Sequence, residues 1–114
     1  MRPQLEALLH ASPKVVSFQV LDNDPIDEAN FLFKIRCELT SGRVLQIRLH
    51  AVAGHVRYSY QELGDRPLRR WDNAPHFPGL PGFPHHHHDG SGIVSASSFS
   101  GEPVADLSRV LDTL

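Results

Sequence analysis

A chain of 114 residues is long enough for one folded domain and too short for two ordinary ones, so we expect a single domain over residues 1–114. Apolar residues make up 40% and charged residues 21% of the sequence, which is typical of an ordinary soluble globular protein. The single cysteine, Cys37, excludes an internal disulfide and a zinc cluster built from cysteines.

Nothing in the sequence indicates a membrane or an export signal. No apolar run approaches the roughly 20 residues that a transmembrane helix needs. Residues 1–14 are too short and too interrupted to carry the apolar stretch of a secretory signal. We therefore expect a cytoplasmic protein with no membrane contact.

The net charge of −2 hides a basic middle section. Residues 34–70 contain eight lysines and arginines against three acidic residues, a net charge of +5. Such a section is compatible with contact to phosphates. The plain alternative is that these charges lie on the solvated outer faces of strands.

The first half of the chain predicts a short helix followed by strands. Residues 3–10 place Leu5, Leu8 and Leu9 on one side of a helix, which Ser12-Pro13 ends. Residues 16–21 alternate as a strand, and the acidic residues 22–30 predict a loop. The clearest period-two pattern follows in residues 31–39, with Lys34, Arg36 and Glu38 on the polar face.

Three more strands are expected after this one. Residues 45–50 alternate as the partner of a hairpin, residues 56–61 alternate after Gly54, and residues 67–72 follow the turn at Gly64-Asp65. The C-terminal residues 102–114 then place Val104, Leu107, Leu111 and Leu114 at helical spacing. The fold class predicted is α+β, an antiparallel β-meander of four to five strands covered by N- and C-terminal helices over its apolar face.

The segment between the meander and the last helix holds the richest chemistry. Residues 73–92 are expected to form a loop rich in proline and histidine, because prolines recur at every third position from Pro75 to Pro84. Loops on a rigid scaffold often carry functional residues, and histidine transfers protons near neutral pH. If the histidine run is extended, His86 and His88 lie on one face, while His85 and His87 lie on the other.

These residue types suit metal-free cleavage of RNA. The reaction needs a base for the 2′-hydroxyl, an acid for the leaving 5′-oxygen and a cation for the phosphorane, roles that histidine and arginine fill. Aromatic side chains can stack on unpaired bases, although each is also a natural core residue. The candidate catalytic residues are His76, His85, His86, His88 and Asp72, where Asp72 either orients a histidine or simply caps the turn at Asn73. The candidate substrate-binding residues are Arg57, Tyr58, Arg69, Arg70, Trp71 and Asn73. His10, His50 and His55 are interpreted as ordinary surface residues.

Three segments together resemble one family, namely VRYSYQ (56–61), RRWDNAPHFP (69–78) and FPHHHHD (83–89). They are similar to the TumE-like toxins of bacterial and archaeal toxin–antitoxin modules. The resemblance implies a small toxin, silenced by a helix-turn-helix antitoxin, for which ribonuclease activity is the usual expectation. By position, the family's motif residues here are Tyr58, Arg70, Trp71, Asp72, Asn73, Pro75, His76, His85, His86 and His88. The chain departs from the family pattern at Phe77, where a second histidine is usual, and at His87, where a lysine is usual.

Two other functions stay open from the sequence. The same histidines suit zinc, in which case His76, His86 and His88 would be the ligands and the protein a metal-dependent hydrolase or sensor. Alternatively, the proline segment docks a partner protein and the histidines take no part in chemistry. The favoured interpretation is a protein that needs no cofactor, acts on RNA and binds an antitoxin. This interpretation leaves open whether the protein forms a homodimer.

Overall fold

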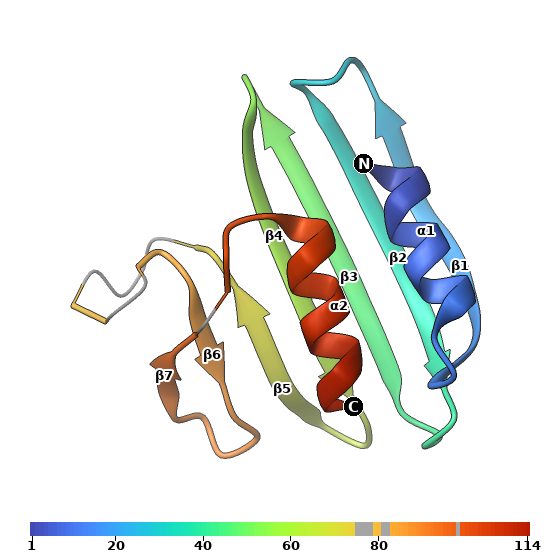
Figure 1. The fold of residues 1–114 in the computed structure, drawn as a ribbon. Coiled ribbons are helices and arrows are strands. Elements are labelled where there is room, and N and C mark those ends of the chain that lie inside the picture. Colours follow the sequence, from blue (N-terminus) through green and yellow to red (C-terminus); the bar gives the residue numbers. More distant parts are fainter. Residues whose placement is uncertain (75–78, 81–82, 98) are drawn as a thin grey trace.

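The computed structural model is an open antiparallel sheet with one helix at each end of the chain. It describes residues 1–74, 79–80, 83–97 and 99–114 (Figure 1). The elements in chain order are α1 (Arg2–Ala11), β1 (Val15–Pro25), β2 (Phe31–Leu39), β3 (Val44–Val52), β4 (His55–Leu63), β5 (Pro67–Asp72), β6 (His86–His88), β7 (Val94–Ala96) and α2 (Pro103–Thr113). The α+β class is confirmed.

The sheet contains seven strands in the order in which they occur along the chain, each antiparallel to the next. The expected count of four to five is therefore too low. The two additional strands are β6, which lies inside the range expected to be a loop, and β7, which follows it. Strand β6 has no apolar alternation, because it consists only of His86, His87 and His88, and β7 contains only the three residues Val94–Ala96.

Both helices cover the same face of the sheet, α1 over β1 and β2 and α2 over β3 and β4 (Figure 1). Alternate strand residues point toward the helices, as the pattern of β2 shows, where every second residue from Phe31 to Leu39 is buried. Leu5 and Leu9 of α1 and Leu107 and Val110 of α2 complete this core, each at most 1% exposed. We call this side of the sheet the covered face and the other side the open face.

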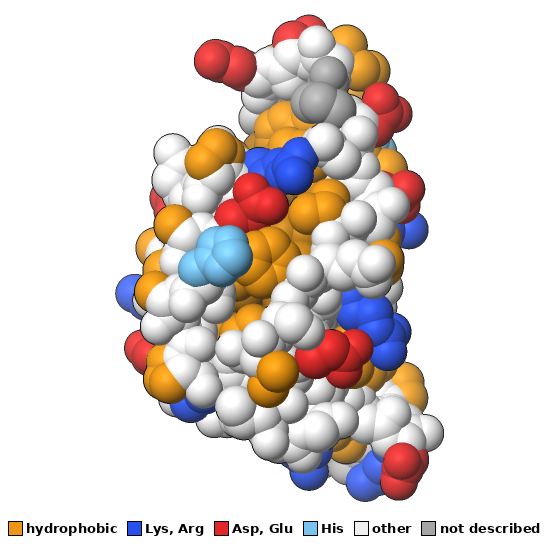
Figure 2. All heavy atoms as spheres, turned by 90° about the vertical axis from the view of Figure 1, so that its right-hand side faces the viewer, with side chains coloured by type: hydrophobic (Ala, Val, Ile, Leu, Met, Phe, Trp, Pro, Cys, Tyr) orange, Lys and Arg blue, Asp and Glu red, His pale blue; other side chains and the backbone are white. Residues whose placement is uncertain are grey.

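The outer edge of the sheet at β1 carries an apolar groove against α1. Leu9 and Val15 line it together with Val16, which is 67% exposed. In Figure 2, apolar side chains fill a hollow on this side of the molecule. The groove lies at the opposite end of the strand order from β6, so it takes no part in positioning the histidines.

The hairpin between β3 and β4 turns through two residues with positive φ. Ala53 has φ 52° and Gly54 has φ 80°, the left-handed backbone of a tight two-residue hairpin turn. Glycine adopts this backbone without steric cost, whereas Ala53 is strained. The turn sets the register in which His50 faces Arg57.

Among the described residues, no helix is long and apolar enough to span a membrane.

Candidate functional site

Polar side chains from five strands line up in two transverse rows on the open face. The first row follows the cross-strand pairs Lys34–Arg48–Ser59–Asp72–His86. The second follows Arg36–Gln46–Gln61–Arg70–His88. Because neighbouring strands lie about 4.8 Å apart, the rows bring residues far apart in sequence within a few strand spacings of the histidines. The sheet register therefore builds the site.

Asp72 is the centre of the polar contacts at the β5–β6 end of these rows. Its Oδ1 lies 2.8 Å from Nε2 of His86, and its Oδ2 accepts a hydrogen bond from Nε of Arg70 at 2.8 Å. Its Oδ1 also accepts the backbone N–H of Ala74 at 3.0 Å. The Asp72 side chain is only 6% exposed, and a buried carboxylate needs such partners.

His86 is held on both sides of its ring. Nδ1 lies 3.1 Å from the carbonyl oxygen of Pro84, while Nε2 faces Asp72. The His86 side chain is 2% exposed. With both nitrogens engaged, this ring positions Asp72 and offers a substrate little access.

His88 is the accessible imidazole of the pair. Its side chain is 30% exposed, and its Nε2 lies 3.7 Å from Oδ2 of Asp72. The His86 and His88 rings lie edge to face with centroids 4.8 Å apart. Burial lowers the pKa of His88 below its ordinary value of 6.5, with the Asp72 carboxylate opposing this shift. The ring is thus neutral at neutral pH and suited to accept a proton.

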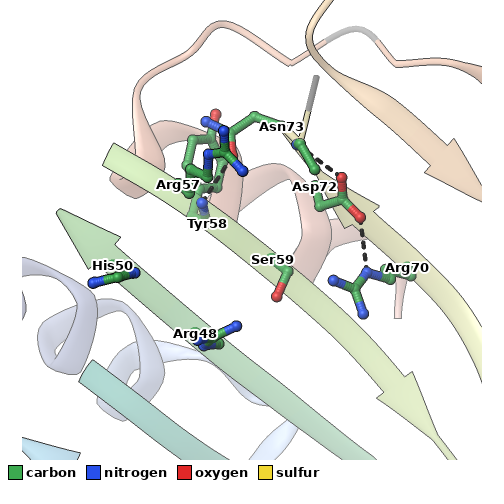
Figure 3. Close-up of a pocket in the computed structure, with 9 residues that line it drawn as sticks. Arg48, His50, Arg57, Tyr58, Ser59, Arg70, Asp72 and Asn73 are labelled. Atoms are coloured by element: carbon green, nitrogen blue, oxygen red, sulfur yellow. Dashed lines mark hydrogen bonds and ion pairs between the residues drawn. The ribbon is translucent and has the colours of Figure 1, made fainter. Parts of the chain in front are cut away.

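Next to this cluster, the open face is hollowed by a depression of about 230 Å³ (Figure 3). Its charged lining comes from β3, β4 and β5, namely Arg48, His50, Arg57, Arg70 and Asp72. The guanidinium groups of Arg48 and Arg57 form no ion pair or side-chain hydrogen bond within the described part of the chain. The depression therefore presents two uncompensated positive charges, which is the electrostatic requirement for holding a phosphate.

The covered face receives the other half of the histidine run. His85 has Nδ1 3.5 Å from the hydroxyl of Tyr58, and the His87 ring packs on Trp71 with centroids 5.1 Å apart. The strand alternation thus separates His86 and His88 from His85 and His87. Of the candidate catalytic residues, the structure brings together Asp72, His86 and His88.

Three of the candidate substrate-binding residues also lie on the covered face. Tyr58 is 3% and Trp71 7% exposed, so both rings are part of the core. Arg69 donates to Glu62 at 2.9 Å and to the carbonyl of Thr113 at 3.2 Å, and its guanidinium lies over the Trp71 ring. These contacts tie β5 to β4 and α2, on the side of the sheet away from Arg57 and Arg70.

Asn73 braces the beginning of β4. Its side-chain oxygen accepts the N–H of Tyr58 at 2.8 Å, and its amide donates to the carbonyl of Val56 at 2.8 Å. Asn73 thereby fixes the wall of the depression. His76 lies outside the described residues, and its catalytic role stays a prediction.

Arg48, His50 and Ser59 also line the depression, although the sequence pattern did not single them out. From the sequence alone, His50 is interpreted as an ordinary surface residue and Arg48 has no specific role. The period-two pattern could have indicated all three, because it places Arg48 and His50 on the same polar face of β3 as Gln46, and Ser59 on the polar face of β4.

Three side chains could hold a metal ion. Asp72, His86 and His88 each offer a ligand atom, and these atoms lie within 4.8 Å of one another. Two imidazoles and a carboxylate fit zinc by donor type. Both oxygens of Asp72 are, however, already bonded to His86 and to the Arg70 guanidinium, which a divalent cation would have to displace. This set differs from the expected His76, His86 and His88 in containing Asp72.

Comparison with known proteins identifies the family. None of the curated proteins or solved structures compared with the chain matches it. A family model described as Toxin TumE matches residues 5–114, which confirms the resemblance seen in the sequence. The chain therefore belongs to the TumE toxin family, and it is a toxin with an antitoxin partner.

Proposed function

We propose that this toxin inhibits growth by cleaving RNA on the open face, without a metal ion, at the depression beside Asp72, His86 and His88. The observation that carries the proposal is that an accessible histidine with a lowered pKa, His88, lies 3.7 Å from Asp72, which lines a depression that also holds two guanidinium groups without a partner among the described residues. Cytoplasmic RNA is then the substrate. A helix-turn-helix antitoxin that covers this face would silence the toxin, and no homodimer is needed to complete the site.

His88 is the general base in this proposal. Its neutral ring takes the proton of a 2′-hydroxyl, whose oxygen forms a bond to the adjacent phosphorus as the bond to the 5′-oxygen breaks. The leaving 5′-oxygen takes up a proton, from water or from His76, and the products are a 2′,3′-cyclic phosphate and a free 5′-hydroxyl. General base catalysis of this kind contributes roughly 100- to 10,000-fold to a rate.

The cations and the buried pair have separate roles. Arg48 and Arg57 bind the phosphate and stabilise the charge that develops on its oxygens. Arg70 and His86 hold Asp72 in place, and Asp72 lies 3.7 Å from His88, where its charge stabilises the protonated ring. Asp72 and His86 are thus positioning residues.

A matched pair of variants tests the proposal, because His87 and His88 are neighbours on opposite faces of β6. His88→Ala should reduce the cleavage rate of purified single-stranded RNA by at least about 100-fold and abolish growth inhibition on induction. His87→Ala should keep most of both, and thermal melting should show that both variants are folded. Wild-type cleavage should persist in EDTA. Equal activity of the two variants, or a wild-type protein that cleaves no RNA, would rule the proposal out.

A metal-dependent hydrolase is the second candidate, favoured by the convergence of ligand atoms from Asp72, His86 and His88. The bound zinc would supply a Lewis acid and an activated water. Elemental analysis of protein purified without a nickel resin tests this version. About one zinc per chain, with activity lost in EDTA and restored by zinc, would replace the metal-free proposal. A metal-free protein that remains active would eliminate the second candidate.

A further inference from the structure

A second hollow of about 180 Å³ lies beside the first on the open face. It shares Arg48, Ser59 and Arg70 with the first depression and extends away from His88 toward β2. The residues that belong to it alone are Lys34, Gln46 and Gln61. The RNA cleavage proposed above gives no role to these three residues.

Two glutamines distinguish the lining of this hollow. Gln46 and Gln61 are directly opposed across β3 and β4, and both are half-buried. Among the described residues, neither side-chain amide forms a hydrogen bond with the protein. Each amide therefore has an oxygen that can accept and an NH₂ that can donate to a ligand.

The charges around the glutamines favour an anionic ligand. Arg48 has no ion-pair partner in the described part of the chain, and Lys34 has only the exposed Asp22 at 3.5 Å. Among the residues that the structure describes, no acidic side chain and no aromatic ring line the hollow. A ligand that combines phosphate with hydrogen-bonding edges fits this lining, whereas a ligand that must stack does not.

The register places the glutamines close to the proposed base. Gln61 is opposite Arg70, and Arg70 is opposite His88. Two strand spacings, about 10 Å, therefore separate Gln61 from His88 along the second transverse row. A nucleotide adjoining a linkage at His88 can reach the glutamines.

We propose that this hollow is a base-reading subsite, in which Gln46 and Gln61 hydrogen-bond the edge of an unpaired RNA base next to the cleaved linkage while Lys34 holds the flanking phosphate. The inference rests on the proposed function, since it takes RNA as the ligand. Base edges with an adjacent donor and acceptor, as in adenine, match a glutamine amide. In a duplex these edges are paired or lie in a groove that side chains cannot enter, so the substrate is single-stranded.

Mapping of cleavage sites in total RNA tests the subsite. Gln46→Leu combined with Gln61→Leu removes the amides and keeps the size of the side chains. The wild type should enrich one base at a fixed position beside the cleaved linkage by about tenfold, and the double variant should lose that enrichment. The matched control is Gln19→Leu, an exposed glutamine in the same row that lies outside the hollow. Unchanged base preference in the double variant would overturn the subsite.

A binding measurement separates this inference from the proposed chemistry. Single-stranded 2′-O-methyl oligonucleotides lack the nucleophile, so their affinity is measurable by fluorescence anisotropy whether or not the protein cleaves RNA. The subsite predicts that the wild type discriminates among oligo-A, oligo-C and oligo-U and that the double variant does not. If the wild type discriminates without cleaving any RNA, the subsite stands and the proposed cleavage falls. If wild type and double variant bind all oligonucleotides alike, the subsite falls, whatever the cleavage assay shows.

Discussion

The covered face and the open face of strands β3 to β6 differ in how their charged side chains are paired. On the covered face, the buried Glu62 pairs with Arg43 at 3.4 Å and with Arg69 at 2.9 Å. The carboxylate of Asp106, which is 0% exposed, accepts four hydrogen bonds, including one from the Tyr58 hydroxyl at 2.6 Å. On the open face, the guanidinium groups of Arg48 and Arg57 have no partner in the described part of the chain.

The paired charges of the covered face therefore stabilise the fold, whereas the arginines of the open face are available to bind a ligand. Burying a charge is costly unless hydrogen bonds and ion pairs compensate it, and the buried carboxylates of Glu62 and Asp106 both have such partners. An exposed cation pays no such cost, and it can remain unpaired until a phosphate binds. Because side chains alternate between the two faces along each strand, neighbouring residues serve either the core or the ligand-binding surface.

The largest effect should come from removing the most completely bonded group of the covered face. Asp106→Ala leaves the N–H groups of Ser100 and Gly101 and the buried hydroxyl of Tyr58 without their acceptor. We expect the free energy of unfolding to fall by about 3 kcal/mol, because buried groups that lose a charged partner are strongly destabilising. Urea denaturation measures this change.

The control for this variant is Asp112→Ala on the exposed side of the same helix, which should change stability by about 0.5 kcal/mol or less. A similar small loss for Asp106→Ala would mean that the covered face does not depend on its hydrogen-bonded carboxylate.

A smaller effect, on binding alone, is expected from the open face. Arg48→Ala should weaken single-stranded RNA binding about fivefold at moderate salt and reduce the slope of log affinity against log salt by about 0.7, the amount for one phosphate contact on a single strand. Stability should be unchanged. Anisotropy titrations between about 50 and 200 mM salt measure both quantities.

Arg36→Ala is the matched control, because Arg36 is exposed on the same face but pairs with Glu38 at 3.5 Å. Its removal should affect RNA binding less. If Arg36→Ala weakens binding as much as Arg48→Ala, unpaired cations are not what distinguishes the depression.

Much of the fold is predictable from local pattern, and the site is predictable only in part. The alternation in residues 31–39 and the helical spacing of Leu107 and Leu111 predict the sheet and its cover. The same period-two rule predicts that His86 and His88 share a face. The sequence pattern does not predict strand β6, because a run of histidines has no apolar alternation. The strand forms because its backbone pairs with β5.

The partners of the open face depend on register, which a single sequence does not specify. Arg48 meets Ser59, and Ser59 meets Asp72, only because two successive hairpins align them. Single-residue patterns likewise leave aromatic roles undecided. Tyr58 and Trp71 fit either a stacking platform or a core, and only the folded structure shows that both rings are buried in the core.

The smallest effect should be a pH dependence of stability that comes from His87 and His88, which lie on opposite faces of β6. Burial lowers the pKa of His87 and of His88 below 6.5 in the folded protein. Below that pH the unfolded chain binds more protons than the folded chain, so the free energy of unfolding should fall as pH decreases from about 7 to 5. His87→Gln and His88→Gln should each reduce that decrease, whereas His55→Gln, at an exposed position, serves as the control. Urea denaturation at several pH values measures it, and a decrease that is identical in all variants would contradict the prediction.

A side-chain NMR titration with a single-stranded 2′-O-methyl oligonucleotide tests most directly whether the toxin binds RNA on its open face. The Nε–H signals of Arg48 and Arg57 and the ring signals of His88 should shift together and saturate, while those of Arg43 and His87 stay in place. Shifts confined to the covered-face group, with Arg48, Arg57 and His88 unmoved at saturation, would contradict it.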